Sequence, residues 1–224
     1  MTGRLILVRH GETTANVRHS LDTRPPGAPL TELGRSQARA VGERLAEIVG
    51  ARDGTAGRLT GVHTSEAVRA RTTGILLARS MERYAGLPPD SVPVTPRAGL
   101  HEFSAGDLED RTDAASIEMF RSAHLAALSG DPAGMTPGGE NITDFLGRYR
   151  TVIEGVVLPE MAGRAPGDAV VVVHASAMRL FARHATGIAV EDAHPLPNTG
   201  VIILEPGDAP FGRWRLTAWD HRPR

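Results

Sequence analysis

The sequence has 224 residues, 41% of them hydrophobic and 23% charged, and a formal net charge of −1 at pH 7. Such a chain can bury a substantial core, but its near-neutral charge offers no basic field for nucleic acid or for a membrane surface. It contains no cysteine, which excludes thiolate nucleophiles and cysteine-ligated zinc, and no lysine, which excludes a P-loop lysine and a lysine Schiff base.

The first apolar run, residues 5–8, is too short for the hydrophobic core of a signal peptide. No later apolar run approaches the ~20 residues that a transmembrane helix needs. We therefore expect a cytoplasmic protein that does not bind membranes.

Short β-branched runs alternate along the chain with longer segments of helical period. In chain order, the sequence predicts a strand at 5–8, a helix that opens after the N-cap candidate Thr31 and stops at Gly50, a strand at 59–63, a helix at 66–83, a strand at 92–95, helices at 112–128 and 141–161, a strand at 169–173, a helix at 177–184, and strands at 201–204 and 214–219. Residues 169–173 are all apolar, as in a central strand buried on both faces. The alternation predicts an α/β fold, a three-layer α/β/α sandwich around a mostly parallel sheet.

Two segments fit no helix or strand: residues 11–30, with the turn sequence Arg24-Pro25-Pro26-Gly27, and residues 130–139, which are rich in Gly and Pro. Loops of this length inside a compact domain are usually functional. We expect rim or lid segments at about 11–30 and 104–139. No repeat, linker or low-complexity tract is present, so a single domain over residues 1–224 is predicted.

Three of the predicted strands end in residues that can do chemistry. Arg9 and His10 follow the first strand, Arg69 lies just beyond the second, and His174 follows the apolar strand at 169–173. If these strands are parallel, the three segments meet in one crevice, because ligands of open α/β sheets bind at the carboxyl ends of the strands. A tetrahedral dianion explains two arginines and two histidines in one pocket, since the guanidinium fork matches phosphate oxygens and neutral His is a nucleophile toward phosphorus.

These residues belong to a longer set of short blocks spread over the chain. The blocks are Leu7-Val8-Arg9-His10-Gly11-Glu12-Thr13 with Asn16; Pro29-Leu30-Thr31-Glu32-Leu33-Gly34 with Gln37-Ala38; Ser65 with Arg69-Ala70; Leu100-His101-Glu102 with Gly106 and Glu109; Pro137-Gly138-Gly139-Glu140; His174 with Arg179; and Asn198-Thr199-Gly200-Val201. In order and spacing they resemble the signature of the histidine phosphatase superfamily, in its phosphoglycerate mutase-like branch (branch 1). The resemblance covers the chain from Arg4 to about Leu204 and implies a phosphoglycerate mutase-like fold.

The resemblance also implies roles for individual residues. His10 would be the nucleophile, and Glu102 would be the proton donor. Arg9, Asn16, Arg69 and His174 would hold the phosphoryl oxygens. Nearby arginines should lower the pKa of His10, whereas burial or a substrate dianion should raise the pKa of Glu102.

The chain departs from the family pattern at two places beside the expected phosphate site. Ala175 stands where the family usually has Gly after the second histidine, and the methyl group is tolerated unless φ is positive. The Gln-Gly that many of these phosphatases carry after the Asn is missing, and the segment 20–26 stands in that region. We expect this segment to line the substrate rim, with Ala175 and Thr23 among the substrate-binding residues.

The predicted reaction is hydrolysis of a phosphomonoester through a phosphohistidine on His10, without a metal or another cofactor. The other histidines show no spacing typical of zinc ligands. Glu109 is a second candidate acid, although the position of Glu102 in the Leu-His-Glu block favours Glu102.

Two other functions stay open at this point. A phosphoglycerate mutase would return the phosphoryl group to a second hydroxyl of the substrate, but the stretch 110–136 is short for the insertion that closes over the substrate in such mutases. A non-catalytic module that binds phosphorylated ligands would need neither nucleophile nor proton donor. The expected partner is a small phosphorylated metabolite of unknown identity, and a homodimer is possible from the resemblance.

Overall fold

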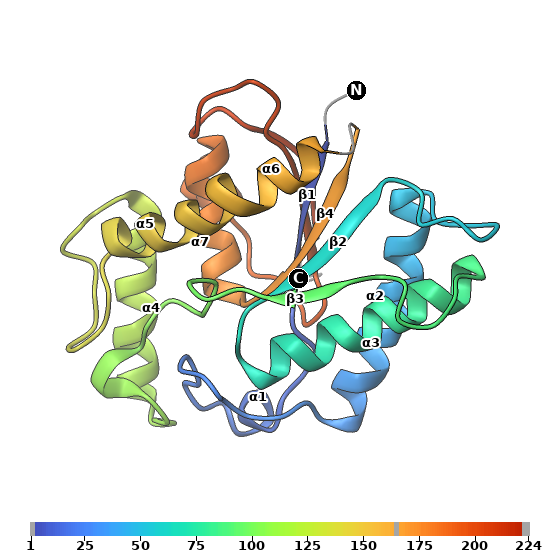
Figure 1. The fold of residues 1–224 in the computed structure, drawn as a ribbon. Coiled ribbons are helices and arrows are strands. Elements are labelled where there is room, and N and C mark those ends of the chain that lie inside the picture. Colours follow the sequence, from blue (N-terminus) through green and yellow to red (C-terminus); the bar gives the residue numbers. More distant parts are fainter. Residues whose placement is uncertain (1–2, 164–165, 221–224) are drawn as a thin grey trace.

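The computed structural model describes residues 3–163 and 166–220, and within them the chain builds one mixed sheet (Figure 1). Its strands are β1 (Arg4–Arg9), β2 (Leu59–Thr64), β3 (Val94–Pro96), β4 (Asp168–Val173), β5 (Val201–Glu205) and β6 (Arg215–Trp219). They lie in the order β3-β2-β4-β1-β5-β6, with β3, β2, β4 and β1 parallel and β5 antiparallel to both of its neighbours. The predicted mostly parallel sheet is confirmed.

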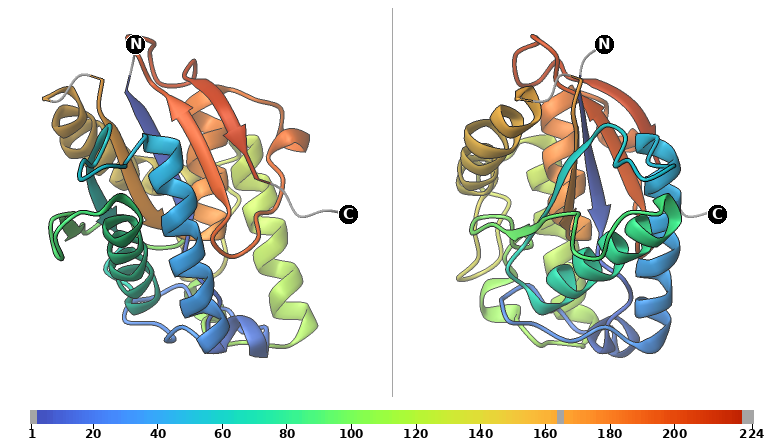
Figure 2. Two further views of the ribbon diagram at one scale, coloured as in Figure 1. Left: turned by 90° about the vertical axis from the view of Figure 1, so that its right-hand side faces the viewer. Right: turned by 45° about the vertical axis from the view of Figure 1, so that its right-hand side comes forward.

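Helices cover both faces of the sheet, as the sequence predicts. They are α1 (Thr14–Arg18), α2 (Glu32–Val49), α3 (Val68–Ala85), α4 (Ala114–Ser129), α5 (Ile142–Val152), α6 (Leu158–Ala162) and α7 (Ala175–Thr186). Figure 2 shows α2 and α3 on one side of the sheet and the group α4 to α7 on the other. The three-layer α/β/α architecture is therefore confirmed.

The alternation of side chains along β1 explains the two buried layers. Leu5 and Leu7 belong to the apolar cluster that includes α5 and α7, whereas Ile6 and Val8 belong to the cluster that includes α2 and α3. Successive side chains of a strand point to opposite faces, so a strand covered on both sides must be apolar at every position. The all-buried run of β4 has the same cause.

Helix α2 begins and ends where its capping residues predict. The Thr31 side chain accepts a hydrogen bond from the Gly34 backbone N–H, and Gly50 closes the helix at φ 73°. A side chain at Gly34 would overlap the Glu12 carbonyl. The absence of a Cβ there lets the segment after β1 lie directly on the first turn of α2.

Two predicted segments differ from the structure. Residues 11–30 were expected to be irregular throughout, but they contain α1, which opens with a reciprocal capping box between Thr13 and Asn16. The expected continuous helix at 141–161 is interrupted by a π-helical turn at Ile153–Val157. Pro159 follows this turn, and because proline has no N–H to donate to the carbonyl four residues earlier, the wider turn accommodates the lost bond.

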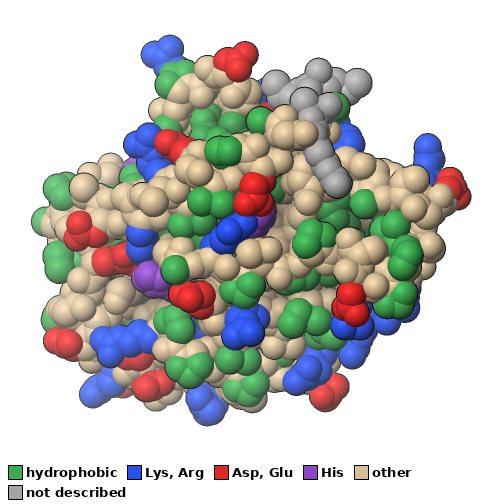
Figure 3. All heavy atoms as spheres, viewed as in Figure 1, with side chains coloured by type: hydrophobic (Ala, Val, Ile, Leu, Met, Phe, Trp, Pro, Cys, Tyr) green, Lys and Arg blue, Asp and Glu red, His purple; other side chains and the backbone are tan. Residues whose placement is uncertain are grey.

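The surface is mixed in charge. Figure 3 shows arginine side chains interspersed with acidic ones on the face viewed in Figure 1. Among the described residues, no helix combines the length and the apolar character needed to cross a membrane.

Candidate active site

The residues singled out in the sequence converge at the carboxyl ends of β1, β2 and β4. A cavity of about 240 Å³ opens there, and its lining includes Arg9, His10, Asn16, Thr23, Arg69, Glu102 and Ala175. His174 lies behind it, with its ring centroid 5.3 Å from that of His10. The parallel order of these strands brings together residues that are up to 166 positions apart.

His10 follows the last residue of β1, and its backbone N–H donates to the Val173 carbonyl of β4. The ring Nδ1 lies 2.8 Å from the Gly11 carbonyl oxygen, which can only accept, so Nδ1 carries the proton. Burial, Arg69 and Arg9 lower the pKa of His10 well below its usual range. The ring is therefore neutral at pH 7, with its lone pair on Nε2.

The tautomer of His174 follows from its two partners. Arg69 Nε donates to His174 Nδ1 at 3.2 Å, so the proton of the neutral ring lies on Nε2 and is donated to Ser65 Oγ at 2.9 Å. Burial and the neighbouring Arg69 keep the pKa of His174 well below its usual range. Ser65 does not cap α3, whose N-cap position is Ala67 without a side-chain bond. Its hydroxyl instead fixes the second histidine.

The two arginines of the cavity are anchored through part of their donors. Arg9 Nη1 donates to the Leu196 carbonyl at 2.7 Å. Arg69 donates from Nη1 to the Asp22 carboxylate and from Nη2 to the Asp22 carbonyl, at 3.2 and 2.9 Å. Within the described chain these contacts leave one N–H on each terminal nitrogen of Arg69, which suits a planar fork that binds two oxygens of one anion.

Glu102 is buried against the first turn of α7. Its Oε1 accepts from the backbone N–H groups of Phe103 and Ala177, at 2.8 and 2.7 Å, and its Oε2 accepts from that of Ser176 at 3.1 Å. Burial raises the pKa of Glu102, although these amides and Arg69 oppose the rise. The direction agrees with the sequence-based expectation. Oε1 accepts two hydrogen bonds and Oε2 accepts only one, so Oε2 is the oxygen that can carry a proton.

Asn16 lies in the cavity wall at the third position of α1. Its Oδ1 accepts from the backbone N–H of Thr13 and from Asn198 Nδ2, both at 3.1 Å. Its own Nδ2 has no hydrogen-bond partner among residues 3–163 and 166–220. The amide is thus oriented with its acceptor occupied and its donors available.

Thr23 lines the cavity, as expected, but its hydroxyl is already used. Thr23 Oγ1 donates to Glu109 Oε2 at 2.6 Å and accepts from the Ala105 backbone N–H at 3.0 Å. Glu109 also accepts from the backbone N–H groups of Thr23 and Arg24, so it is neither a solvated charge nor a free acid. These bonds join the two expected rim segments into one wall.

Ala175 fits its position without strain. It is the first residue of α7 and is absent from the positions with positive φ. The methyl group that replaces the expected glycine therefore meets the condition set in the sequence analysis, a φ that is not positive.

Sequence reasoning did not single out two residues that support the site. Thr73, one turn after Arg69 on α3, accepts from the Gly11 N–H at 3.0 Å and donates to the Arg69 carbonyl at 2.7 Å. Asp22 holds Arg69 from the loop between α1 and α2. Of the two, only Thr73 could have been predicted from the sequence, because its hydroxyl lies one helical turn after Arg69.

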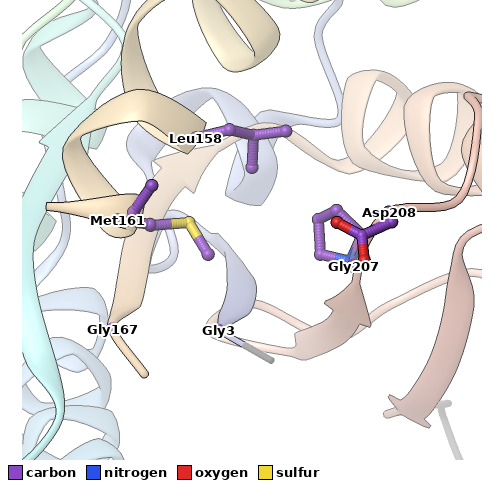
Figure 4. Close-up of a pocket in the computed structure, with 8 residues that line it drawn as sticks. Gly3, Leu158, Met161, Gly167, Gly207 and Asp208 are labelled. Atoms are coloured by element: carbon purple, nitrogen blue, oxygen red, sulfur yellow. The ribbon is translucent and has the colours of Figure 1, made fainter. Parts of the chain in front are cut away.

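A second cavity, of about 200 Å³, lies at the opposite end of the sheet (Figure 4). Gly3 and Gly167, which precede β1 and β4, line it together with Leu158 and Met161. Asp208 is its acidic residue, and none of the described residues that line it is an arginine or a histidine. Among the described residues, no group of three or more His, Cys, Asp or Glu side chains is arranged to hold a metal ion.

The sheet order and a histidine at the end of β1 facing a second histidine at the end of β4 define a class of phosphoryl-handling enzymes. The sequence model of the histidine phosphatase superfamily (branch 1) matches residues 5–221, and the chain belongs to this family. The fold of solved relatives agrees. A mycobacterial glucosyl-3-phosphoglycerate phosphatase solved with VO3 superposes with a TM-score of 0.73 at 25% identity, covering 99% of this chain and 100% of that one.

Two relatives show how the family varies. The chain is 28% identical to PE-PGRS family protein PE_PGRS11 of Mycobacterium tuberculosis over 96% of its own length, but it spans only 36% of that protein. It is 24% identical to a 2,3-bisphosphoglycerate-dependent phosphoglycerate mutase of Gloeothece citriformis, over 90% of this chain and 92% of the mutase. Both a phosphatase and mutases are thus among its relatives.

Proposed function

We propose that this chain is a metal-independent phosphatase that hydrolyses a phosphomonoester through a phosphohistidine on His10. The observation that carries the proposal is the tautomer of His10, because the bond from Nδ1 to the Gly11 carbonyl leaves the Nε2 lone pair as the nucleophile. His10 lines a cavity whose cations are Arg9 and Arg69. Neutralisation and in-line positioning are the main demands of phosphoryl transfer.

In the first half-reaction, His10 Nε2 attacks phosphorus and the bond to the ester oxygen breaks. Glu102 Oε2 donates its proton to the departing alkoxide. In the second half-reaction the ionised Glu102 takes a proton from a water molecule, which attacks phosphorus as the bond to His10 Nε2 breaks and phosphate leaves. Arg9, Arg69, Asn16 and His174 hold the phosphoryl oxygens. His174 can contribute in two ways. Its Nε2–H, which is donated to Ser65 Oγ in the free protein, can be redirected to a phosphoryl oxygen, and its Nδ1 fixes the orientation of Arg69.

The mutase reaction is the second candidate, since several relatives carry that name. Hydrolysis is favoured because residues 110–136 fold as the single helix α4 with short connections rather than as a long insertion over the cavity. Exclusion of water is what a mutase requires, and a short cover favours transfer to water. Cytoplasmic location and a homodimer remain predictions from the sequence.

The decisive experiment measures phosphate release from p-nitrophenyl phosphate by purified protein, with and without EDTA. We expect turnover in chelator, a phosphoryl adduct on the peptide that contains His10 when the protein is kept at alkaline pH, and loss of both in His10→Ala. His19→Asn is the matched control, because His19 is exposed and has φ 56°, where asparagine is well tolerated. Turnover abolished by EDTA, or an adduct that persists in His10→Ala, would refute the mechanism.

Mutase activity is separated from hydrolysis in the same preparation. The protein is given 3-phosphoglycerate with a trace of 2,3-bisphosphoglycerate, and 2-phosphoglycerate and inorganic phosphate are measured together. Accumulation of 2-phosphoglycerate faster than phosphate would favour the mutase over the phosphatase.

A further inference from the structure

The charged groups of the cavity beside His10, here called the phosphoryl cavity, bear on the identity of the substrate. Its cations are Arg9 and Arg69, and its carboxyl groups are Asp22 and Glu102, of which Glu102 carries the proton in the proposed mechanism. Both cations are assigned to the phosphoryl group in the proposed function. A second anionic group close to the ester would therefore meet the Asp22 carboxylate and no further cation among the described residues that line the cavity.

Asp22 is the carboxylate that such a group would meet at the mouth. Its Oδ2 accepts from Arg69 Nη1 at 3.2 Å and from the Ala28 N–H at 3.0 Å. Its Oδ1 has no hydrogen-bond partner in the described part of the chain. Asp22 lines both the phosphoryl cavity and an outer groove of about 420 Å³, so a leaving group that extends outward passes it.

The rest of the cavity wall combines polar residues, among them Asn16 and Ser20, with an apolar part. Leu21 and Phe120 line the cavity, and Phe120 packs on Phe103 with 6.1 Å between ring centroids. The apolar part of the wall fits the carbon skeleton of an alcohol, whereas a carboxylate placed beside Asp22 would lose hydration and meet a like charge. The free Oδ1 of Asp22 can instead accept a hydrogen bond from a hydroxyl group.

We propose that the substrate is a phosphomonoester of an uncharged, hydroxyl-bearing alcohol, and that Asp22 is the residue that selects against a second anionic group near the ester. This inference rests on the proposed phosphatase activity. Asp22 accepts a hydroxyl of the leaving group and repels a carboxylate or a second phosphate at the same place. The repulsion acts between groups only partly exposed to solvent, where charges interact more strongly than in water.

Cations do occur farther out. Arg18 and Arg24 line the outer groove but not the phosphoryl cavity. Selection by Asp22 therefore applies to groups within a few bonds of the phosphate, and short substrates test it without reaching these arginines.

Glycerol 3-phosphate and 3-phosphoglycerate form a matched pair, because they differ only in carrying CH₂OH or a carboxylate at the carbon farthest from the ester. We expect kcat/KM of the wild-type protein to be at least about tenfold higher for glycerol 3-phosphate, which corresponds to ~1.4 kcal/mol. Equal or better hydrolysis of 3-phosphoglycerate would overturn the inference while leaving the phosphatase intact. If neither ester, nor p-nitrophenyl phosphate, is hydrolysed, the proposed function itself is wrong.

The variant Asp22→Asn assigns the selection to one residue. It keeps the shape and the acceptor for Arg69 but removes the charge, so the ratio of the two kcat/KM values should fall at least threefold, through better use of 3-phosphoglycerate. Asp110→Asn is the matched control, because Asp110 lines only the outer groove and its φ of 64° suits asparagine. A ratio unchanged in Asp22→Asn, or changed equally in Asp110→Asn, would remove the role of Asp22. If Asp22→Asn does not fold, the wild-type comparison still decides the substrate class.

Discussion

The bonds that join the two rim segments give a stability prediction that can be worked out from the structure. The Glu109 carboxylate accepts three hydrogen bonds, from Thr23 N at 2.7 Å, Thr23 Oγ1 at 2.6 Å and Arg24 N at 3.0 Å. A hydrogen bond to a charged group contributes about 1.5–3 kcal/mol. Glu109 is half-buried, so water replaces part of what Glu109→Ala removes, and we expect the free energy of unfolding to fall by about 2–4 kcal/mol.

A loss of that size should lower Tm by roughly 5–15 °C, since a chain of this length loses about 2–4 °C for each kcal/mol. Glu109→Gln should cost less than half as much, because its amide oxygen can still accept both backbone N–H groups that reach Oε1. Glu109→Ala should also affect substrate binding, because Asp22 is next to Thr23 and holds Arg69 in place. We expect KM of this variant for p-nitrophenyl phosphate to rise more than its kcat falls.

Thermal and urea unfolding measure the stability change, and initial rates measure KM. Glu118→Ala is the control, because Glu118 is an exposed residue of α4 whose solvated ion pair with Arg121 contributes little to stability. If Glu109→Ala unfolds within about 2 °C of the wild type, or if Glu109→Gln costs as much as Glu109→Ala, the three bonds do not hold the wall together.

Three further predictions concern protonation and the second histidine. Glu102→Gln should lower kcat about 10²–10⁴-fold for an alkyl phosphate and much less for p-nitrophenyl phosphate, whose leaving group needs no proton; an equal loss for both substrates would exclude the acid role. The pKa values of His10 and His174 lie below their usual range in the folded protein, so the unfolded chain binds more protons below pH ~6.5 and the free energy of unfolding should fall as the pH drops through that point. Urea titrations at several pH values between neutral and acidic conditions measure this dependence. A free energy of unfolding that does not change with pH would contradict the buried neutral rings. Ser65→Ala removes the acceptor of the His174 Nε2–H and leaves a buried donor without a partner, so it should cost about 1–3 kcal/mol of stability. It should also lower kcat, and Ser65→Thr should partly restore kcat. An unchanged kcat in Ser65→Ala would show that His174 does not need this bond.

The parts of the structure that the sequence predicts well are those set by local chemistry or by periodicity. Thr31 and Gly50 mark both ends of α2 because a cap depends on residues within one turn. The continuously apolar run at 169–173 predicts β4, and with it the crevice that gathers His10, Arg69 and His174. The convergence required only that the strands be parallel.

The parts that were missed depend on pairs of residues far apart in the chain. The bond between the Thr23 hydroxyl and Glu109, 86 positions away, is one such pair. Asp22 binds Arg69, 47 positions away, and the sequence around either residue gives no signal that predicts this pair. The helix α1 was missed because its five residues show too little periodicity, although the Thr13 and Asn16 capping pair was there to be read.

One physical cause sets the protonation states on both sides of the proposed transfer. Burial disfavours the charged form of every group, so it lowers the pKa of His10 and raises that of Glu102. Both shifts favour the neutral forms that the proposed mechanism requires, a lone pair on His10 and a proton on Glu102. Arg9 and Arg69 stay charged because a guanidinium does not deprotonate in proteins. A substrate dianion entering between them then raises the pKa of Glu102 further, so binding itself prepares the proton that the leaving group requires.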